Sequence, residues 1–231
     1  MRFVVTAGPT REFIDPVRFL SNPSTGRMGF AVARAARAAG HEVTLIAGPV
    51  ALKTPRGVRR VDVVSARDML AAVLAELGGP PSGGPRSCAA AEPIALVMTA
   101  AVADWRPARC AARKLKKSEM SDTLKLVRNP DILKAIDRQL GGPRSRAAAH
   151  LIRIGFAAET GAPAAEAARK CREKGLDLVV GNDVTARGSG FGTTTNRVTF
   201  VTPDGIVRRL PLMSKLAVAR RIVRFVEGVG G

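Results

Sequence analysis

The sequence predicts an α/β protein with a three-layer, Rossmann-like fold and a mostly parallel central sheet. Apolar runs of strand length alternate with longer, alanine-rich runs of helix length along most of the chain. Glycine or proline follows many of these runs, as expected where an element ends. Near the C-terminus, two apolar runs flank Pro203-Asp204-Gly205, which predicts an antiparallel hairpin added to the parallel sheet.

The first half of the chain opens with a βαβ pattern. Phe3–Ala7 predicts a buried strand that ends at Gly8-Pro9, and alanine-rich Met28–Ala39 predicts a helix that ends at Gly40. Val43–Ala47 predicts the next strand. The other elements expected in this half are a strand at Val58–Val64, a helix at Ala66–Leu77 and a strand at Ile94–Thr99.

The second half continues the alternation. The elements expected there are a helix from Pro130, a strand at Leu151–Phe156, a helix at Pro163–Lys174, a strand at Leu176–Val180, hairpin strands at Arg197–Thr202 and Ile206–Leu210, and a last helix from about Ser214 to Glu227. The Gly- and Pro-rich stretches Gly78–Pro85 and Gly141–Ala149 read as surface loops. We therefore expect a single domain over residues 1–231.

The charge of the chain restricts its ligands. A formal net charge of +18 predicts a positive potential that attracts nucleotides, phosphorylated metabolites or nucleic acid. The charge alone cannot distinguish these ligands, and arginine scattered over solvated helix faces explains the same excess.

Cysteine usage and apolar run lengths indicate a soluble cytoplasmic protein. Cys88, Cys110 and Cys171 are odd in number and widely spaced, which favours free thiols over disulfides or a zinc site. The apolar run at the N-terminus is too short for a signal peptide, and Ile94–Ala103 is too short to cross a bilayer.

The first motif is the long polar segment Thr6–Gly29, which links a strand to a helix. It places Asn22, Ser24, Thr25 and Gly26 just before the helix, where free amides and the helix dipole favour an anion such as phosphate. Ordinary N-capping by Ser24 or Thr25 is the alternative. The spacing matches neither a P-loop nor a GxGxxG dinucleotide site, so a standard NAD enzyme is disfavoured.

The second motif, Thr99–Pro107, follows a central strand, where open α/β sheets commonly bind ligands. Asp104 could accept from a ribose, a base or metal-bound water, although an isolated acid more often caps a turn. The following loop, Arg109–Ser121, carries five Lys or Arg side chains. Among them, Lys114 could neutralise charge on a transferring phosphoryl or nucleotidyl group, or simply face solvent.

Two further motifs surround later elements. Arg128–Leu133 places Pro130 at a first helical position, which leaves free amides beside it, and Gly155–Thr160 places Phe156 at a strand end. Lys170 and Lys174 are one helical turn apart and share a face, which suits a triphosphate but is also common on plain surfaces.

Taken in order, these motifs resemble the phosphopantothenoylcysteine synthetase family, whose domain bacteria often carry fused behind a flavin-dependent decarboxylase. The resemblance covers nearly the whole chain. It rests on the segments TAGPTRE, IDPVRFLSNPSTGRMG, AAVADWRP, the KxKK loop, NPDIL, GFAAET, GNDV and FGTTTNRV. The decarboxylase part is not found in this sequence, so the resemblance leaves open a separate decarboxylase or a chain excised from a longer one.

The resemblance implies which residues act. Its nucleotide-contacting positions are Thr99, Ala100, Asp104, Lys114, Pro130, Asp131, Ile132, Leu133, Phe156, Lys170 and Lys174. Its positions for the pantothenoyl group and the acyl intermediate are Arg18 and Asn22, and we expect amides near Gly8, Ser24, Thr25 and Gly26 to anchor phosphates. Asn22 and Lys114 are thus the expected catalytic residues. No metal ligands are assigned.

The implied reaction joins 4'-phosphopantothenate to L-cysteine in coenzyme A biosynthesis. CTP is cleaved to CMP and pyrophosphate through an acyl-cytidylate, with Mg²⁺ required. CTP rather than ATP follows from the bacterial relatives only. The resemblance also implies a homodimer, for which the apolar hairpin region Val198–Leu210 could supply the contact surface.

Two alternatives belong to other classes. A nucleic-acid-binding protein would use the fold as a basic scaffold, but no RNP-like aromatic motif is present and Trp105 is the single tryptophan. We therefore expect no specific nucleic-acid partner. A catalytically silent relative is disfavoured because Asn22, Asp104 and Lys114 are all retained.

Overall fold

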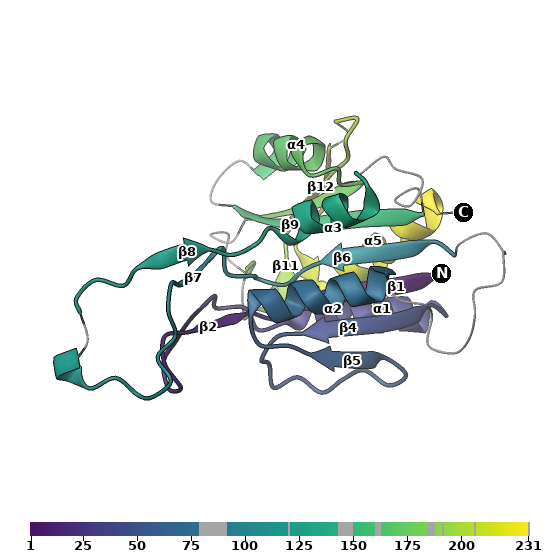
Figure 1. The fold of residues 1–231 in the computed structure, drawn as a ribbon. Coiled ribbons are helices and arrows are strands. Elements are labelled where there is room, and N and C mark those ends of the chain that lie inside the picture. The colour runs from purple at the N-terminus through teal and green to yellow at the C-terminus, as the bar shows by residue number, and fades with distance from the viewer. Residues whose placement is uncertain are drawn as a thin grey trace.

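The protein folds around one eight-stranded sheet in the strand order β13-β12-β10-β9-β6-β1-β4-β5 (Figure 1). The computed structural model describes residues 1–78, 92–119, 121–142, 150–159, 163–183, 188–190, 192–205 and 207–230. The strands of the sheet are β1 (Arg2–Ala7), β4 (Glu42–Ala47), β5 (Arg59–Asp62), β6 (Ile94–Met98), β9 (Leu151–Glu159), β10 (Leu178–Asp183), β12 (Val198–Val201) and β13 (Val207–Arg209). From β5 to β10 neighbouring strands are parallel, while β12 and β13 pair antiparallel.

Helices cover both faces of the sheet, which gives three layers. The helices are α1 (Arg27–Ala38), α2 (Ala66–Gly78), α3 (Ile132–Leu140), α4 (Pro163–Glu173) and α5 (Lys215–Val229). One core cluster packs α1 and α5 on the sheet through residues such as Phe30 and Ile222. The other packs α2, α3 and α4 on the opposite face through residues such as Met69 and Ile136. The predicted three-layer fold with an antiparallel C-terminal hairpin is therefore confirmed.

Two short hairpins form an arm that projects from one end of the sheet (Figure 1). The first pairs β2 (Arg11–Phe13) with β3 (Phe19–Ser21), and the second pairs β7 (Trp105–Pro107) with β8 (Leu126–Arg128). Between β7 and β8 lies the single-turn helix η1 (Lys117–Glu119). We call these segments, residues 11–21, 105–119 and 121–128, the arm. A further pair, β11 (Thr195–Asn196) and β14 (Met213–Ser214), precedes α5.

The arm corrects one sequence expectation and confirms another. Thr6–Gly29 was expected to be a loop, but it contains the β2–β3 hairpin. The described residues of Arg109–Ser121 form the expected loop, with the single-turn helix η1 in it, but this loop joins the two strands of the β7–β8 hairpin instead of leading directly to a helix. The strands of these hairpins have three residues each, too few for an apolar alternation to be visible in the sequence.

Other expectations differ in position. Strand β10 begins at Leu178 rather than Leu176, which ends a turn instead. The hairpin was expected to offer apolar surface to a partner, but Val198, Phe200 and Leu210 are buried in the core, so that expectation is wrong for these side chains. Most of the two expected loops, residues 79–85 and 143–149, lies outside the described residues.

The two cysteines that the structure describes are free thiols. Cys110 is exposed and Cys171 is buried, both as free thiols, while Cys88 lies outside the described residues. Burial raises the pKa of the Cys171 thiol to about 11, so this sulfur stays protonated. Within the described ranges, no helix combines the length and apolar character needed to span a bilayer.

Candidate functional site

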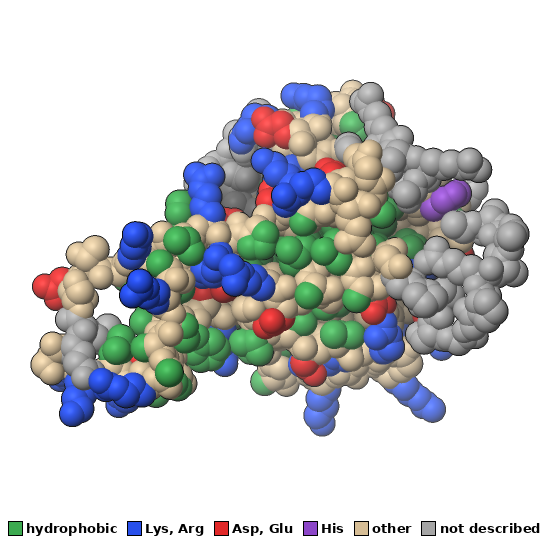
Figure 2. Space-filling view, in the orientation of Figure 1, with side chains coloured by type: hydrophobic (Ala, Val, Ile, Leu, Met, Phe, Trp, Pro, Cys, Tyr) green, Lys and Arg blue, Asp and Glu red, His purple; other side chains and the backbone are tan. Residues whose placement is uncertain are grey.

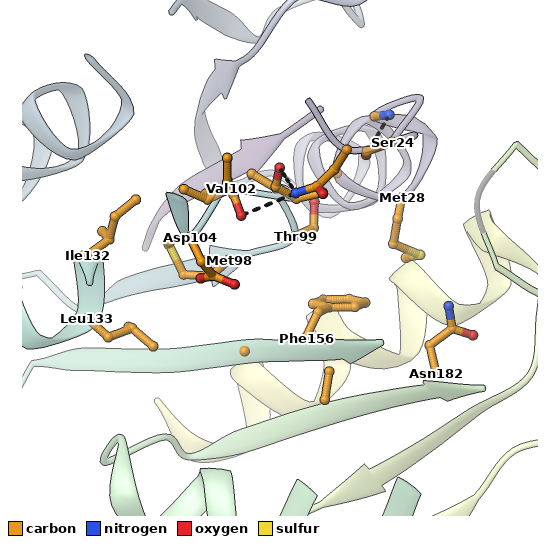
Figure 3. A pocket seen from close by; sticks show the side chains of 18 of the residues that line it. Ser24, Met28, Met98, Thr99, Val102, Asp104, Ile132, Leu133, Phe156 and Asn182 are labelled. Carbon is orange, nitrogen blue, oxygen red and sulfur yellow. Dashed lines mark hydrogen bonds between the residues drawn. The ribbon is translucent and has the colours of Figure 1, made fainter. Parts of the chain in front are cut away.

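A cavity of about 870 Å³ lies across the carboxyl-terminal parts of β6, β9 and β10. Its walls come from the segment before α1, the segment after β6, the start of α3, one face of α4 and the start of α5. Figure 3 shows Phe156 in the middle, with Ile132 and Leu133 on one side and Asn182 on the other. This is the edge of an open α/β sheet where ligands usually bind.

Two glycines, Gly26 and Gly29, determine how α1 begins beside the cavity. Gly26 is the N-cap residue, with a φ of 75°, and no side chain caps the helix. The expected alternative, capping by Ser24 or Thr25, is wrong, because the chain enters the helix through a left-handed glycine. A Cβ atom on Gly29 would lie 2.5 Å from Ala7 Cβ and 2.6 Å from Thr99 Oγ1, so α1 packs tightly on β1. The first amides of α1 therefore face the cavity uncapped, as an anion site requires.

Hydrogen bonds hold the segment after β6 against the segment before α1. Asn22 Nδ2 donates to Ala101 O at 3.1 Å and to Val102 O at 3.3 Å. Thr99 Oγ1 donates to Thr6 O at 2.6 Å. The structure thus places Asn22, Thr99 and Ala100 in one wall of the cavity, together with Ser24, Thr25 and Gly26.

The start of α3 forms the wall beyond Asp104. Asp104 is exposed at the cavity, and its backbone oxygen accepts from Asn129 N at 2.8 Å. Helix α3 begins at Ile132 with Asp131 as its N-cap, so the expectation that Pro130 occupies the first helical position is wrong. Asp131 accepts from Lys134 N and supplies the side-chain cap, which proline cannot do.

Two lysines of α4, Lys170 and Lys174, line the cavity near the start of α3. Lys170 Nζ donates to Phe156 O at 2.9 Å, and Lys174 Nζ pairs with Asp131 Oδ2 at 3.1 Å. Burial opposes ionisation of Asp131, but the hydrogen bonds and charges of Lys174 and Lys134 outweigh it and lower its pKa. Both lysines line the cavity, in keeping with the shared helix face that their one-turn spacing predicted.

Three expected site residues lie elsewhere. Gly8, with a φ of 79°, supports the segment before α1 through contact with Gly26 rather than lining the cavity. Arg18 lies in the arm, where it pairs with Asp15 and donates to Leu115 O at 2.9 Å. Lys114 is exposed in the arm, outside the cavity.

Sequence reasoning missed part of the lining. Arg27, Asn196 and Lys215 line the end of the cavity beyond Phe156, near Asn182 and Gly190. The GNDV and FGTTTNRV segments contain Asn182 and Asn196, and no role was assigned to them. Lys215 belongs to no motif, so only the fold reveals it.

Basic side chains are not confined to the cavity. Figure 2 shows Lys and Arg on the arm and over the central part of this face, so the charge is partly scattered and partly concentrated. Among the described residues, no cluster of three or more His, Cys, Asp or Glu could hold a metal ion.

Comparisons with known proteins identify the family of this chain. Residues 1–229 match the family described as DNA/pantothenate metabolism flavoprotein C-terminal domain. The coenzyme A biosynthesis bifunctional protein CoaBC of Bacillus subtilis is 46% identical over 227 residues, which cover 98% of this chain and 51% of that protein. The chain therefore spans about half the length of the curated relatives it matches.

Solved structures show the same fold. The crystal structure of the C-terminal domain of CoaBC matches with a TM-score of 0.76 and 37% identity, over 99% of this chain and 94% of that one. A mutant of Cab2 in complex with phosphopantothenate-cysteine matches with a TM-score of 0.73 and 16% identity, over 99% of this chain and 86% of that one. The ordered motifs indicated the same relationship, and this chain belongs to the DNA/pantothenate metabolism flavoprotein C-terminal domain family.

Proposed function

We propose that this chain is a ligase of coenzyme A biosynthesis that joins 4'-phosphopantothenate to L-cysteine, with CTP cleaved to CMP and pyrophosphate. The observation that carries this proposal is one cavity that brings together uncapped helix amides, Asp104 and the two α4 lysines. Such a cavity suits a nucleotide and a second phosphorylated substrate side by side. The family and the similarity to the coenzyme A biosynthesis protein CoaBC support the pathway, and the phosphopantothenate-cysteine bound by the Cab2 mutant supports the product.

The chemistry explains why a nucleotide is needed. The carboxylate of phosphopantothenate attacks the α-phosphorus of CTP, and the bond to pyrophosphate breaks. The amine of cysteine then attacks the acyl carbon of the acyl-cytidylate, CMP leaves with the bonding electron pair, and the amine loses a proton. CMP is a far better leaving group than oxide, so the mixed anhydride makes the acyl transfer feasible.

Residues of the cavity would position the groups and offset their charge. Lys170 and Lys174 would bind the phosphates of CTP, and Asn22 would orient the acyl group beside the segment after β6. We keep Lys114 as a catalytic residue of the first step, although it lies in the arm. Lys114 would reach the cavity of its own chain if the arm moves, or the cavity of a partner chain in a dimer.

Mg²⁺ would accompany CTP in this proposal. Mg²⁺ sites commonly use one or two carboxylates together with the phosphates of the substrate. Within the described residues, Asp104 forms no ion pair and lies at the cavity, so it fits this pattern. The bound ion would neutralise charge on the triphosphate.

We also propose a homodimer that uses the arm. Five large apolar side chains of the arm are exposed, namely Val17, Phe19, Trp105, Leu124 and Leu126. Apolar groups gathered on a projecting segment are typical of an interaction surface. A symmetric dimer would bury them and could bring Lys114 and Arg18 to the partner's cavity. A flavin-dependent decarboxylase, in the same chain or a separate one, would act on the product.

Product analysis with each nucleoside triphosphate tests this function. The protein would be incubated with phosphopantothenate, cysteine, Mg²⁺ and CTP, ATP, GTP or UTP, and pyrophosphate and phosphate would be measured. We expect pyrophosphate with CTP, only when phosphopantothenate is present. Release of phosphate instead would indicate an acyl phosphate and contradict the proposed chemistry.

A further inference from the structure

Lys215 is a buried cation at the end of the cavity that the proposed mechanism does not use. It is the first residue of α5, is only 7% exposed and lines the cavity. Its Nζ donates to Gly190 O at 3.0 Å. Burial and then the nearby Arg27 lower the pKa of Lys215, so the surroundings disfavour its charged form.

Several features make this position unfavourable for a cation. A lysine in the first turn of a helix opposes the helix dipole, and the same holds for Arg27, the first residue of α1. Within the described part of the chain, neither Lys215 nor Arg27 forms an ion pair. A buried charge without a counter-ion is costly, and an anion bound in the cavity would remove that cost.

Hydrogen bonds hold Lys215 in place. Its backbone amide donates to Thr194 O at 3.0 Å. Beside it, Ser189 Oγ lies 2.8 Å from Asn182 Oδ1 and 2.6 Å from Asn196 Oδ1. These contacts link Asn182 and Asn196 through Ser189, whose neighbour Gly190 accepts the hydrogen bond from the ammonium group, and the two asparagines also line the cavity. Lys215 is therefore a buried side chain held by hydrogen bonds, unlike an ordinary surface lysine.

The position of Lys215 indicates which anion it binds. Lys170, Lys174 and the start of α3 form the end of the cavity assigned to CTP, and Phe156 separates that end from Asn182 (Figure 3). Phosphopantothenate carries its carboxylate at one end and its phosphate at the other. Because the carboxylate must reach the α-phosphate of CTP, the phosphate of phosphopantothenate must point away from the nucleotide.

We propose that Lys215, with Arg27 at the rim and the uncapped amides of α1, binds the terminal phosphate monoester of 4'-phosphopantothenate. This inference rests on the proposed function. It assigns Lys215 to substrate selection, because pantothenate, which lacks the phosphate, would leave the buried ammonium without an anion. The γ-phosphate of CTP is the other phosphate that Lys215 could bind at this position.

Calorimetry separates these possibilities without depending on turnover. Binding of phosphopantothenate, pantothenate and CTP would be measured for wild type, Lys215→Met and Arg224→Gln, an exposed charge on the same helix. We expect Lys215→Met to weaken phosphopantothenate binding about 10- to 100-fold, the usual value of a charge-assisted hydrogen bond. Binding of CTP and of pantothenate should be unchanged, and Arg224→Gln should behave like wild type.

Thermal unfolding guards against a folding defect. Because Lys215→Met removes a buried charge, we expect its Tm to equal or exceed that of wild type. Weaker binding of CTP with unchanged phosphopantothenate binding would overturn the inference, as would an equal loss for all three ligands. If wild type binds phosphopantothenate far more tightly than pantothenate through Lys215 but releases no pyrophosphate, the inference stands and the proposed function fails.

Discussion

The cavity and the arm differ in how their side chains are held. The segment after β6, which lines the cavity, is held by fully buried side chains, because Thr6 Oγ1 accepts from Ala100 N and Thr10 Oγ1 accepts from Ala103 N. The arm instead depends on Asp15, whose carboxylate accepts from Arg18 and from the amides of Val17, Arg18 and Leu115. The body of the chain supplies most of the cavity lining, and the arm adds Trp105 and Arg128 to it. The arm also leaves Trp105 46% exposed, and the proposed dimer would cover this surface.

The largest expected effect concerns Lys114 in the arm. If Lys114 counters charge on the α-phosphate, Lys114→Gln should slow pyrophosphate release about 10²- to 10³-fold, or about 3 to 4 kcal/mol. Lys53→Gln is the matched control, because Lys53 is exposed and lies outside every motif. An equally modest loss in both variants, erased at high ionic strength, would show that Lys114 is only part of a diffuse basic surface.

Mixing variants tests whether the arm serves a neighbouring cavity. Lys114→Gln and Lys174→Gln should each be nearly inactive, since one lacks the arm lysine and the other a cavity lysine. In a symmetric dimer with shared sites, denaturing and refolding an equal mixture should restore about a quarter of wild-type activity. Sedimentation should show a dimer at micromolar concentration. No recovery on mixing would place Lys114 in its own chain's site or in none.

A smaller effect is expected where α1 meets the sheet. Gly29→Ala places a methyl group within 2.9 Å of Ala7, Thr99 and the Thr6 oxygen, so it should destabilise the fold by about 1–3 kcal/mol in urea unfolding. It should also weaken anion binding, because the uncapped amides move. Gly228→Ala has open space and should stabilise by up to about 1 kcal/mol. Equal effects in both variants would contradict the close packing.

The smallest expected effect is the pH dependence of the arm. The hydrogen bond from Arg18 holds the pKa of Asp15 far below its usual range, despite burial and with help from three amides. Because its pKa is lower in the folded state, the Asp15 carboxylate stabilises the fold at pH values above its unfolded pKa of about 4. This stabilisation is lost progressively as the pH falls below that value. The stability difference between wild type and Asp15→Asn should therefore be constant from neutral pH to about 5 and shrink below about 4. A difference that grows in acid would contradict this assignment.

The main fold was predictable because long elements carry clear patterns. Strand Phe3–Ala7 and the helix near Ser214, which is the N-cap of α5, were expected within one or two residues. The arm was not, since its three-residue strands have no periodicity and are held by a polar network around Asp15.

The site was predictable where a motif followed a strand. Asn22, Asp104 and Phe156 were expected from such motifs, and all three line the cavity. Lys215 reaches the cavity only through the packing of α5, which no local pattern encodes. Lys114 lies in the arm outside the cavity, and in the proposed dimer its place would be set by contacts with the other chain, which no local pattern encodes.

Isotope transfer tests the central proposal most directly. Phosphopantothenate labelled with ¹⁸O in its carboxylate would be converted with CTP and cysteine, and the nucleotide and phosphate products would be examined by mass spectrometry. We expect one ¹⁸O atom in CMP, because the carboxylate oxygen that attacks the α-phosphorus leaves with it. Label in inorganic phosphate, or no label in CMP while the amide forms, would contradict an acyl-cytidylate.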